Sequence, residues 1–147
     1  MKKMLLLFVP ILLACTKPTP LPTPSGKAEV IMQAPRGKVK EALVGRALDT
    51  GWNIKKADES AVVMGRRSDS VMLGMLAGSQ YDAQPELRIR YDLVEVAAGT
   101  RVVSTAMIVT NPDSAFERIT TLDPGAKAYL SIQAALNEVK TKVEQAS

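Results

Sequence analysis

Residues 85–110, which read PELRIRYDLVEVAAGTRVVSTAMIVT, decide the fold. Apolar and polar side chains alternate over residues 85–96, as expected for a strand that buries one face. Residues 97–100 contain a glycine and predict a four-residue turn, after which residues 101–110 predict a returning strand. The sequence therefore predicts a long antiparallel hairpin. Its first strand places Leu87, Ile89, Tyr91 and Leu93 on one face, and Glu86, Arg88, Arg90 and Asp92 on the other.

A second hairpin and a helix are predicted upstream of residue 85. Residues 52–56 alternate, residues 57–59 turn the chain, and the valine-rich residues 60–66 return. Residues 28–33 predict a short first strand. A helix follows, with Pro35 at its first position, apolar residues at helical spacing, and Gly51 suited to a left-handed cap. Lys38, Lys40, Glu41 and Arg46 are expected on the opposite, solvent side of this helix.

A second helix is predicted near the C-terminus. We expect a polar linking segment to reach Asp123, which would cap this helix, with Pro124 at the first helical position. Its apolar stripe is Tyr129, Ile132, Leu136, Val139 and Val143. The element order β-α-β-β-β-β-α predicts an α+β fold, in which a single antiparallel sheet of about five strands packs under two helices.

One passage also carries a family resemblance. Residues 35–66 contain a helix with Val39 and Leu43, then Gly51 and Trp52, and then Asp58 followed by a valine strand. This order resembles the repeated domain of the C lipoprotein of the outer-membrane β-barrel assembly machinery. The resemblance implies a helix-grip, TBP-like domain over residues 28–147 that binds protein and does not catalyse a reaction.

The N-terminus predicts a membrane anchor. Lys2 and Lys3 precede an apolar run at residues 5–13. Ala14 and Cys15, the only cysteine, follow this run directly. A helix needs about 20 apolar residues to span a bilayer, so this run is too short. The pattern resembles the lipobox of bacterial lipoproteins, which implies a signal peptide at residues 1–14 and a lipid on Cys15. By analogy with Gram-negative lipoproteins, Thr16 implies the outer membrane. An ordinary secretory signal with a chance cysteine is the alternative.

Residues 15–27 are predicted to be the lipidated cysteine and a proline-rich stalk. Prolines at positions 18, 20, 22 and 24 prevent both helix and sheet. An extended stalk to Gly26 would reach roughly 35 Å at about 3.1 Å per residue. A proline motif that binds a partner's groove is the alternative to this spacer.

The composition excludes several classes of chemistry. The chain has no histidine, and its one cysteine is expected to carry lipid. The usual zinc, copper and haem sites, disulfides, and Ser-His-Asp or Cys-His catalysis are therefore excluded. Only carboxylate chemistry stays formally open, and we predict no enzyme, no cofactor and no metal. The net charge is +4 without any long basic run, and the expected extracytoplasmic location also argues against nucleic acid.

Two surfaces are candidates for binding a partner. The first is an apolar island within residues 71–76, which either binds a partner or fills the core; its candidate residues are Met72, Leu73, Met75 and Leu76. The second is the polar face of the long hairpin, which is otherwise an ordinary sheet face partly covered by loops; its candidate residues are Arg88, Arg90, Val103 and Met107. A third, electrostatic candidate combines Lys55 and Lys56 with Arg66 and Arg67, which would meet anionic lipid headgroups.

The sequence thus predicts an outer-membrane lipoprotein, anchored through Cys15, whose domain binds an envelope protein as an accessory or assembly module. A carrier of small hydrophobic ligands is the main alternative, and a cavity beneath Tyr129, Ile132 and Leu136 would favour it. A phage- or plasmid-encoded exclusion or secretion-system lipoprotein is another.

Overall fold

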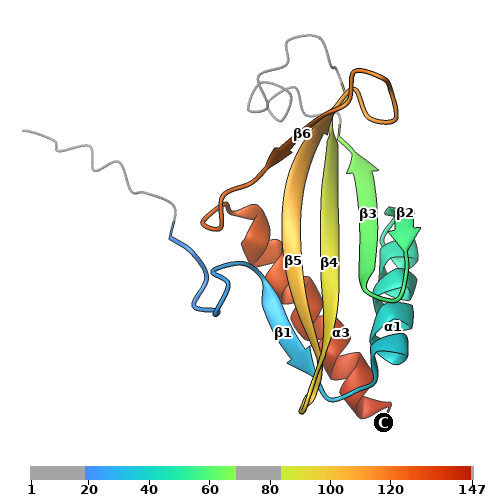
Figure 1. The fold of residues 1–147 in the computed structure, drawn as a ribbon, viewed down its shortest axis with the longest axis vertical. Helices are drawn as coiled ribbons and strands as arrows, with labels where there is room; N and C mark the ends of the chain where they lie inside the picture. Colours follow the sequence, from blue (N-terminus) through green and yellow to red (C-terminus); the bar gives the residue numbers. More distant parts are fainter. Residues whose placement is uncertain (1–18, 69–83, 147) are drawn as a thin grey trace, which may run out of the picture.

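The computed structural model describes residues 19–68 and 84–146. Cys15 with the expected lipobox, and the island with Met72, Leu73, Met75 and Leu76, lie outside the described residues. The described chain forms two layers, a sheet and a pair of helices that both cover the same face of it (Figure 1). The elements are β1 (Glu29–Met32), α1 (Arg36–Asp49), β2 (Asn53–Ala57), β3 (Ala61–Arg67), β4 (Glu86–Val96), β5 (Gly99–Thr110), β6 (Arg118–Thr121) and α3 (Ala128–Gln145).

The sheet is antiparallel, with the strand order β1-β5-β4-β3-β2 and with β6 also paired to β5. β1 pairs with residues 100–103 of β5, and β6 pairs with residues 107–110 of the same strand. The two short strands therefore share one edge of β5. The expected α+β class, with one antiparallel sheet and two helices, is confirmed. The sheet has six strands, because Arg118–Thr121 pairs with the free part of β5 where a linking segment was expected.

The long hairpin of β4 and β5 forms the centre of the sheet. Its turn is only two residues, Ala97 and Ala98, so the expected four-residue turn is wrong. Gly99 opens β5 with a φ of 128°, and a Cβ there would overlap the carbonyl oxygen of Met32. The expected four-residue turn would pair Val96 with Arg101, whereas Val96 pairs with Gly99, so the register is shifted by two residues. A shift by two preserves the faces, because side chains alternate with a period of two.

The core lies between the sheet and the helices. The expected stripe on α3 is confirmed as its buried face: Tyr129, Ile132, Leu136, Val139 and Val143. From α1, the buried residues are Val39, Leu43 and Ala47. The sheet contributes Val62, Met64, Ile89, Tyr91, Leu93, Val102 and Ala106. Within the ranges that the structure describes, no helix combines the length and apolar character needed to cross a membrane.

The ends of the two helices differ in how well the sequence predicts them. α1 is followed by Gly51 with a φ of 74°, as expected for a left-handed cap. α3 begins at Ala128, so the expected start at Asp123 and Pro124 is wrong. Pro124 and Gly125 form a turn instead, in which the Ala126 N–H donates to the Asp123 carbonyl at 2.8 Å. A proline followed by glycine favours such a turn over a helical start.

Residues 21–26 do not continue as an extended stalk. The Leu21 N–H donates to the Gly26 carbonyl at 3.1 Å, and the Gly26 N–H donates to the Thr23 carbonyl at 3.0 Å. Gly26 has a φ of 69°, which lets the chain reverse. Leu21 packs against the core. Burial of this leucine gives the turn a stability that the proline pattern alone does not predict.

Candidate functional site

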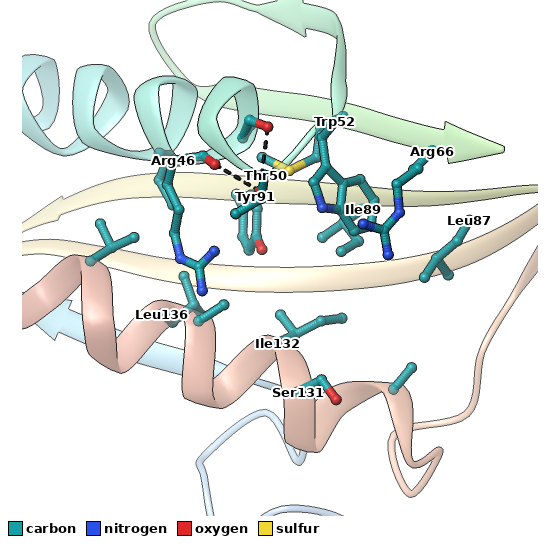
Figure 2. Close-up of a pocket in the computed structure, with 16 residues that line it drawn as sticks. Arg46, Thr50, Trp52, Arg66, Leu87, Ile89, Tyr91, Ser131, Ile132 and Leu136 are labelled. Atoms are coloured by element: carbon teal, nitrogen blue, oxygen red, sulfur yellow. Dashed lines mark hydrogen bonds between the residues drawn. The ribbon is translucent and has the colours of Figure 1, made fainter. Parts of the chain in front are cut away.

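A pocket of about 350 Å³ opens between the helices above the sheet (Figure 2). It lies where the helices diverge, between the C-terminal half of α1 and the N-terminal part of α3 (Figure 1). The sheet side contributes Met64, Arg66, Leu87, Ile89 and Tyr91, and Trp52 stands just before β2. The helix walls are Leu43, Arg46, Ala47 and Thr50 from α1, and Ala128, Ser131, Ile132, Ala135, Leu136 and Val139 from α3.

Small side chains explain why this part of the interface is hollow. Ala128, Ser131 and Ala135 all line the pocket on α3, and none is long enough to reach the strands. Strand alternation places Ile89 and Leu87 on the opposite side, where they form an apolar floor. The result is a concave, mostly apolar pocket with a few polar groups, which is typical of small-molecule sites.

Arg46 is the principal polar residue of the pocket. Its Nη2 donates to Glu138 Oε2 at 2.6 Å, across the gap between the helices. Its Nε is buried and has no hydrogen-bond partner among the described residues. The expected position of Arg46 on the solvent side of α1 is wrong, because the residue lines the pocket. Arg46 lies three residues after Leu43, and this helical spacing could have assigned it to the pocket face.

Tyr91 brings a second polar group to the same pocket. The residue is 4 % exposed, and the described part of the chain supplies no hydrogen-bond partner for its hydroxyl. Burial raises the pKa of Tyr91 to about 12, and the nearby charge of Arg46 opposes this shift only in part. The hydroxyl therefore remains protonated at neutral pH and can donate a hydrogen bond.

A second arginine lies at the other side of the pocket. The guanidinium carbon of Arg66 stands 5.0 Å from the centre of the Trp52 ring, a cation–π contact. The described lining residues include two arginines and no acidic residue. The pocket therefore combines an apolar floor with positive charge.

The expected partner-binding residues of the long hairpin lie on the outer face of the sheet, away from the helices. Arg88 stands opposite Met107, Arg90 opposite Thr105, and Val103 opposite Asp92. Around them, Ile31 is 42 % exposed and Val94 is 52 % exposed. The structure thus brings Arg90, Val103 and Met107 together on the face of the sheet that the two helices leave uncovered.

Arg88 belongs to an ion-pair network that we call the outer-face charge network. Its members are Lys55, Glu86, Arg88, Asp113 and Glu117. Glu86 is 2 % exposed and accepts from Arg88 Nε at 2.7 Å, while its other oxygen lies 3.0 Å from Lys55 Nζ. Arg88 also pairs with Glu117 at 3.0 Å. These bonds fasten the loop before β6 to the sheet, so the Arg88 guanidinium is already paired within the fold.

The basic residues of the third candidate do not form one patch. Lys55 belongs to the outer-face charge network, and Lys56 pairs with Asp58 at 2.7 Å. Arg66 lines the pocket on the helix side, whereas Arg67 lies opposite Glu86 on the outer face. Adjacent strand residues point to opposite faces, which separates the two arginines.

Comparisons with models of known protein families, with curated proteins and with solved structures found no match. Within residues 19–68 and 84–146, no group of three His, Cys, Asp or Glu side chains is placed to hold a metal ion.

Proposed function

We propose that this chain is a lipid-anchored protein of the cell envelope that binds the apolar part of a small ligand without transforming it. The pocket between α1, α3 and the sheet carries this proposal. Its volume lies within the range of about 300 to 1,000 Å³ that is usual for ligand sites. Two of the three residues beneath which a cavity would favour a carrier, Ile132 and Leu136, line this pocket, whereas Tyr129 packs in the core and does not line it.

The anchor rests on the lipobox pattern that ends at Cys15, and Thr16 supports the outer membrane as the location. The turn at residues 21–26 limits the spacer to the residues before Leu21. Residues 16–20 would reach about 15 Å if extended. We therefore place the domain near the lipid surface. A radiolabelled fatty acid should be incorporated into the wild-type chain and absent from Cys15→Ala.

The arrangement of one antiparallel sheet beneath a long C-terminal helix also supports the helix-grip, TBP-like architecture as our proposal for the fold. α3 lies across the sheet and buries a continuous stripe against it (Figure 1). Folds with this layout can hold a ligand between the sheet and the helix, which agrees with the position of the pocket.

The proposed binding can be tested by blocking the pocket. Trp52 is the only tryptophan and lines the pocket, so its fluorescence should report occupancy. The full chain with Cys15→Ala, which removes the attached lipid, is titrated with dodecanol. We expect a saturable change that is lost in Ser131→Phe, because the new ring fills the space.

Ala134→Phe is the matched control, because Ala134 is exposed on the same helix and does not line the pocket. This variant should bind dodecanol as the parent chain does. Shorter alcohols should bind more weakly by about fourfold for each methylene removed, the equivalent of about 0.8 kcal/mol. A response that survives Ser131→Phe, or that is the same for octanol and dodecanol, would refute binding in this pocket.

A second candidate function, the binding of an envelope protein, rests on the outer face. The helices leave this face uncovered, and Ile31 and Val94 are exposed on the same face as Arg90. Photo-crosslinkers placed at Arg90 and Met107 in intact envelopes should then give a discrete protein adduct, and one placed at Ala134 should not. Equal adducts at all three positions would indicate non-specific contact.

A further inference from the structure

The polar groups inside the pocket indicate what kind of ligand it accepts. A buried hydrogen-bond donor without a partner costs free energy, so proteins rarely contain one. Where one lines a pocket, a bound molecule can supply the acceptor. Arg46 Nε is such a donor, and Tyr91, whose hydroxyl can also donate a hydrogen bond, lines the same pocket. Neither group finds an acceptor among the residues that the structure describes.

The two groups lie at one end of the pocket. Figure 2 shows Arg46 and Tyr91 on one side, Leu87 and Arg66 on the other, and Ile89 and Ile132 between them. Glu138, which does not line the pocket, accepts from Nη2 of Arg46 and holds the guanidinium in place, while the buried Nε stays without a partner among the described residues. A polar end therefore joins an apolar channel.

We propose that the pocket binds a single-chain amphiphile with an anionic head, whose oxygens accept hydrogen bonds from Arg46 and Tyr91 and whose tail lies over Ile89 and Ile132 toward Leu87. A carboxylate or a phosphate supplies the same acceptor chemistry. This inference rests on the proposed function, because it names the ligand class of the same pocket.

Charge complementarity favours an anion over a neutral or cationic ligand. The described lining residues carry two positive charges and no negative charge; Glu138 compensates part of the charge of Arg46 from beyond the lining, and Arg66 has no carboxylate partner among the described residues. Guanidinium groups bind carboxylates and phosphates through hydrogen bonds assisted by charge. A cationic head would be repelled by Arg46, and a neutral hydroxyl would gain only an uncharged acceptor contact. Arg66 adds positive potential at the far side, where it stands over the Trp52 ring.

The test compares four probes that share a twelve-carbon chain: dodecanoate, dodecyl phosphate, dodecanol and dodecyltrimethylammonium. Each is titrated below its micellar concentration into the full chain with Cys15→Ala, and Trp52 fluorescence reports binding. We expect at least one anion to bind tenfold or more tightly than dodecanol, because hydrogen bonds to charged groups are the stronger ones. The ammonium probe should bind most weakly, and the tighter anion identifies the head group.

Two variants locate the head. Arg46→Gln removes the charge, and Tyr91→Phe removes the hydroxyl while keeping the ring. Each should weaken binding of the preferred anion about tenfold or more and weaken dodecanol binding by a clearly smaller factor, because the alcohol loses only an uncharged contact. Arg67→Gln is the matched control, because it removes a charge from the same chain on the opposite face of the sheet. It should change the affinity for the anion less than twofold.

The outcomes distinguish failure of the anionic head group from failure of ligand binding in the pocket. If dodecanol binds as tightly as both anions, the anionic head is refuted, while the apolar pocket stands. If Arg67→Gln weakens anion binding as much as Arg46→Gln does, the preference is a general effect of charge and the assigned contacts are wrong. If no probe changes Trp52 fluorescence or binds by calorimetry, the proposed function fails together with this inference.

Discussion

The two faces of the sheet treat buried polar groups in opposite ways. On the outer face, Glu86 is almost fully buried but lies 2.7 Å from Arg88 and 3.0 Å from Lys55. On the helix face, Arg46 Nε is buried without a partner, and the Tyr91 hydroxyl also lacks one among the described residues. The outer-face charge network therefore has a structural role, because its buried charge is paired within the fold. The polar groups of the pocket, in contrast, indicate an acceptor that a bound molecule would supply.

This difference shows that burial alone does not identify a binding site. A buried charge is tolerated where the fold supplies its counter-charge, and it then serves to hold elements together. Polar groups that the fold leaves unpaired beside an empty volume point to a ligand. The predictions below test whether the outer-face groups are structural and the pocket groups are not.

The largest effect is expected from Glu86→Ala. The change leaves Lys55 and Arg88 close together without the carboxylate that joins them. Loss of one partner from a buried ion pair typically costs about 3 to 5 kcal/mol of unfolding free energy. Urea denaturation measures this cost. Glu95→Ala is the control on the same strand, because the Glu95 side chain is exposed and its ion pair with Arg36 is long, at 3.9 Å. Equal costs for the two variants would contradict a structural role for Glu86.

A smaller loss is expected from Gly65→Ala. A Cβ at Gly65 would come within 2.5 Å of the Glu86 carboxylate, so the side chain must leave its two cations. We expect a cost of about 1 to 3 kcal/mol, as is usual for overpacking. In a Glu86→Ala background the same change should cost much less, since the clash is gone. Additive costs in this double-mutant cycle would show that the two residues are not coupled.

The two buried tyrosines provide a matched pair on the helix face. The Tyr129 hydroxyl accepts a hydrogen bond from the Ala106 N–H at 3.1 Å, so Tyr129→Phe should cost about 1 to 3 kcal/mol by leaving that N–H unpaired. Tyr91→Phe leaves no described group unpaired and should change stability by less than about 0.5 kcal/mol. Thermal unfolding of the ligand-free chains measures both. A large cost for Tyr91→Phe would mean that its hydroxyl is already paired within the chain.

The smallest effect concerns pH. A hydrogen bond from Lys55 lowers the pKa of Asp113, and one from Arg88 lowers the pKa of Glu117. Both ionised carboxylates thus favour the folded state above their ordinary values of 3.8 and 4.5, and this stability is lost as the pH falls through the lower folded values. We expect the urea midpoint to decrease from about pH 5 downward. The decrease should be smaller in Asp113→Asn with Glu117→Gln; an unchanged decrease would assign it to other carboxyls.

Much of the fold could be predicted because it depends on local patterns. The alternation over residues 85–96 specifies a strand with two different faces, and the apolar stripe from Tyr129 to Val143 specifies one buried face of a helix. The errors concern places where another segment decides. β6 forms because β5 leaves part of an edge free, and Leu21 folds back because the core offers it an apolar surface.

The candidate binding residues also separate into those that local sequence pattern predicts and those that depend on packing between distant segments. The outer-face residues Arg90, Val103 and Met107 follow from strand alternation, which the two-residue shift of the hairpin left intact. The pocket could not be predicted as a site, because Arg46, Tyr91 and Ser131 come from three different elements. A side chain's identity shows that it can donate a hydrogen bond, but not whether an acceptor will stand beside it.

The sequence by itself determined the two-faced strands, the helical stripes, the absence of histidine and the position of the single cysteine. These are properties of neighbouring residues or of composition, so they do not depend on how the chain packs. Only the tertiary structure decided which charges are paired, where the helices diverge, and that a pocket with unpaired donors remains between them. Pairing and empty volume are relations between distant segments, and they exist only when those segments have packed together.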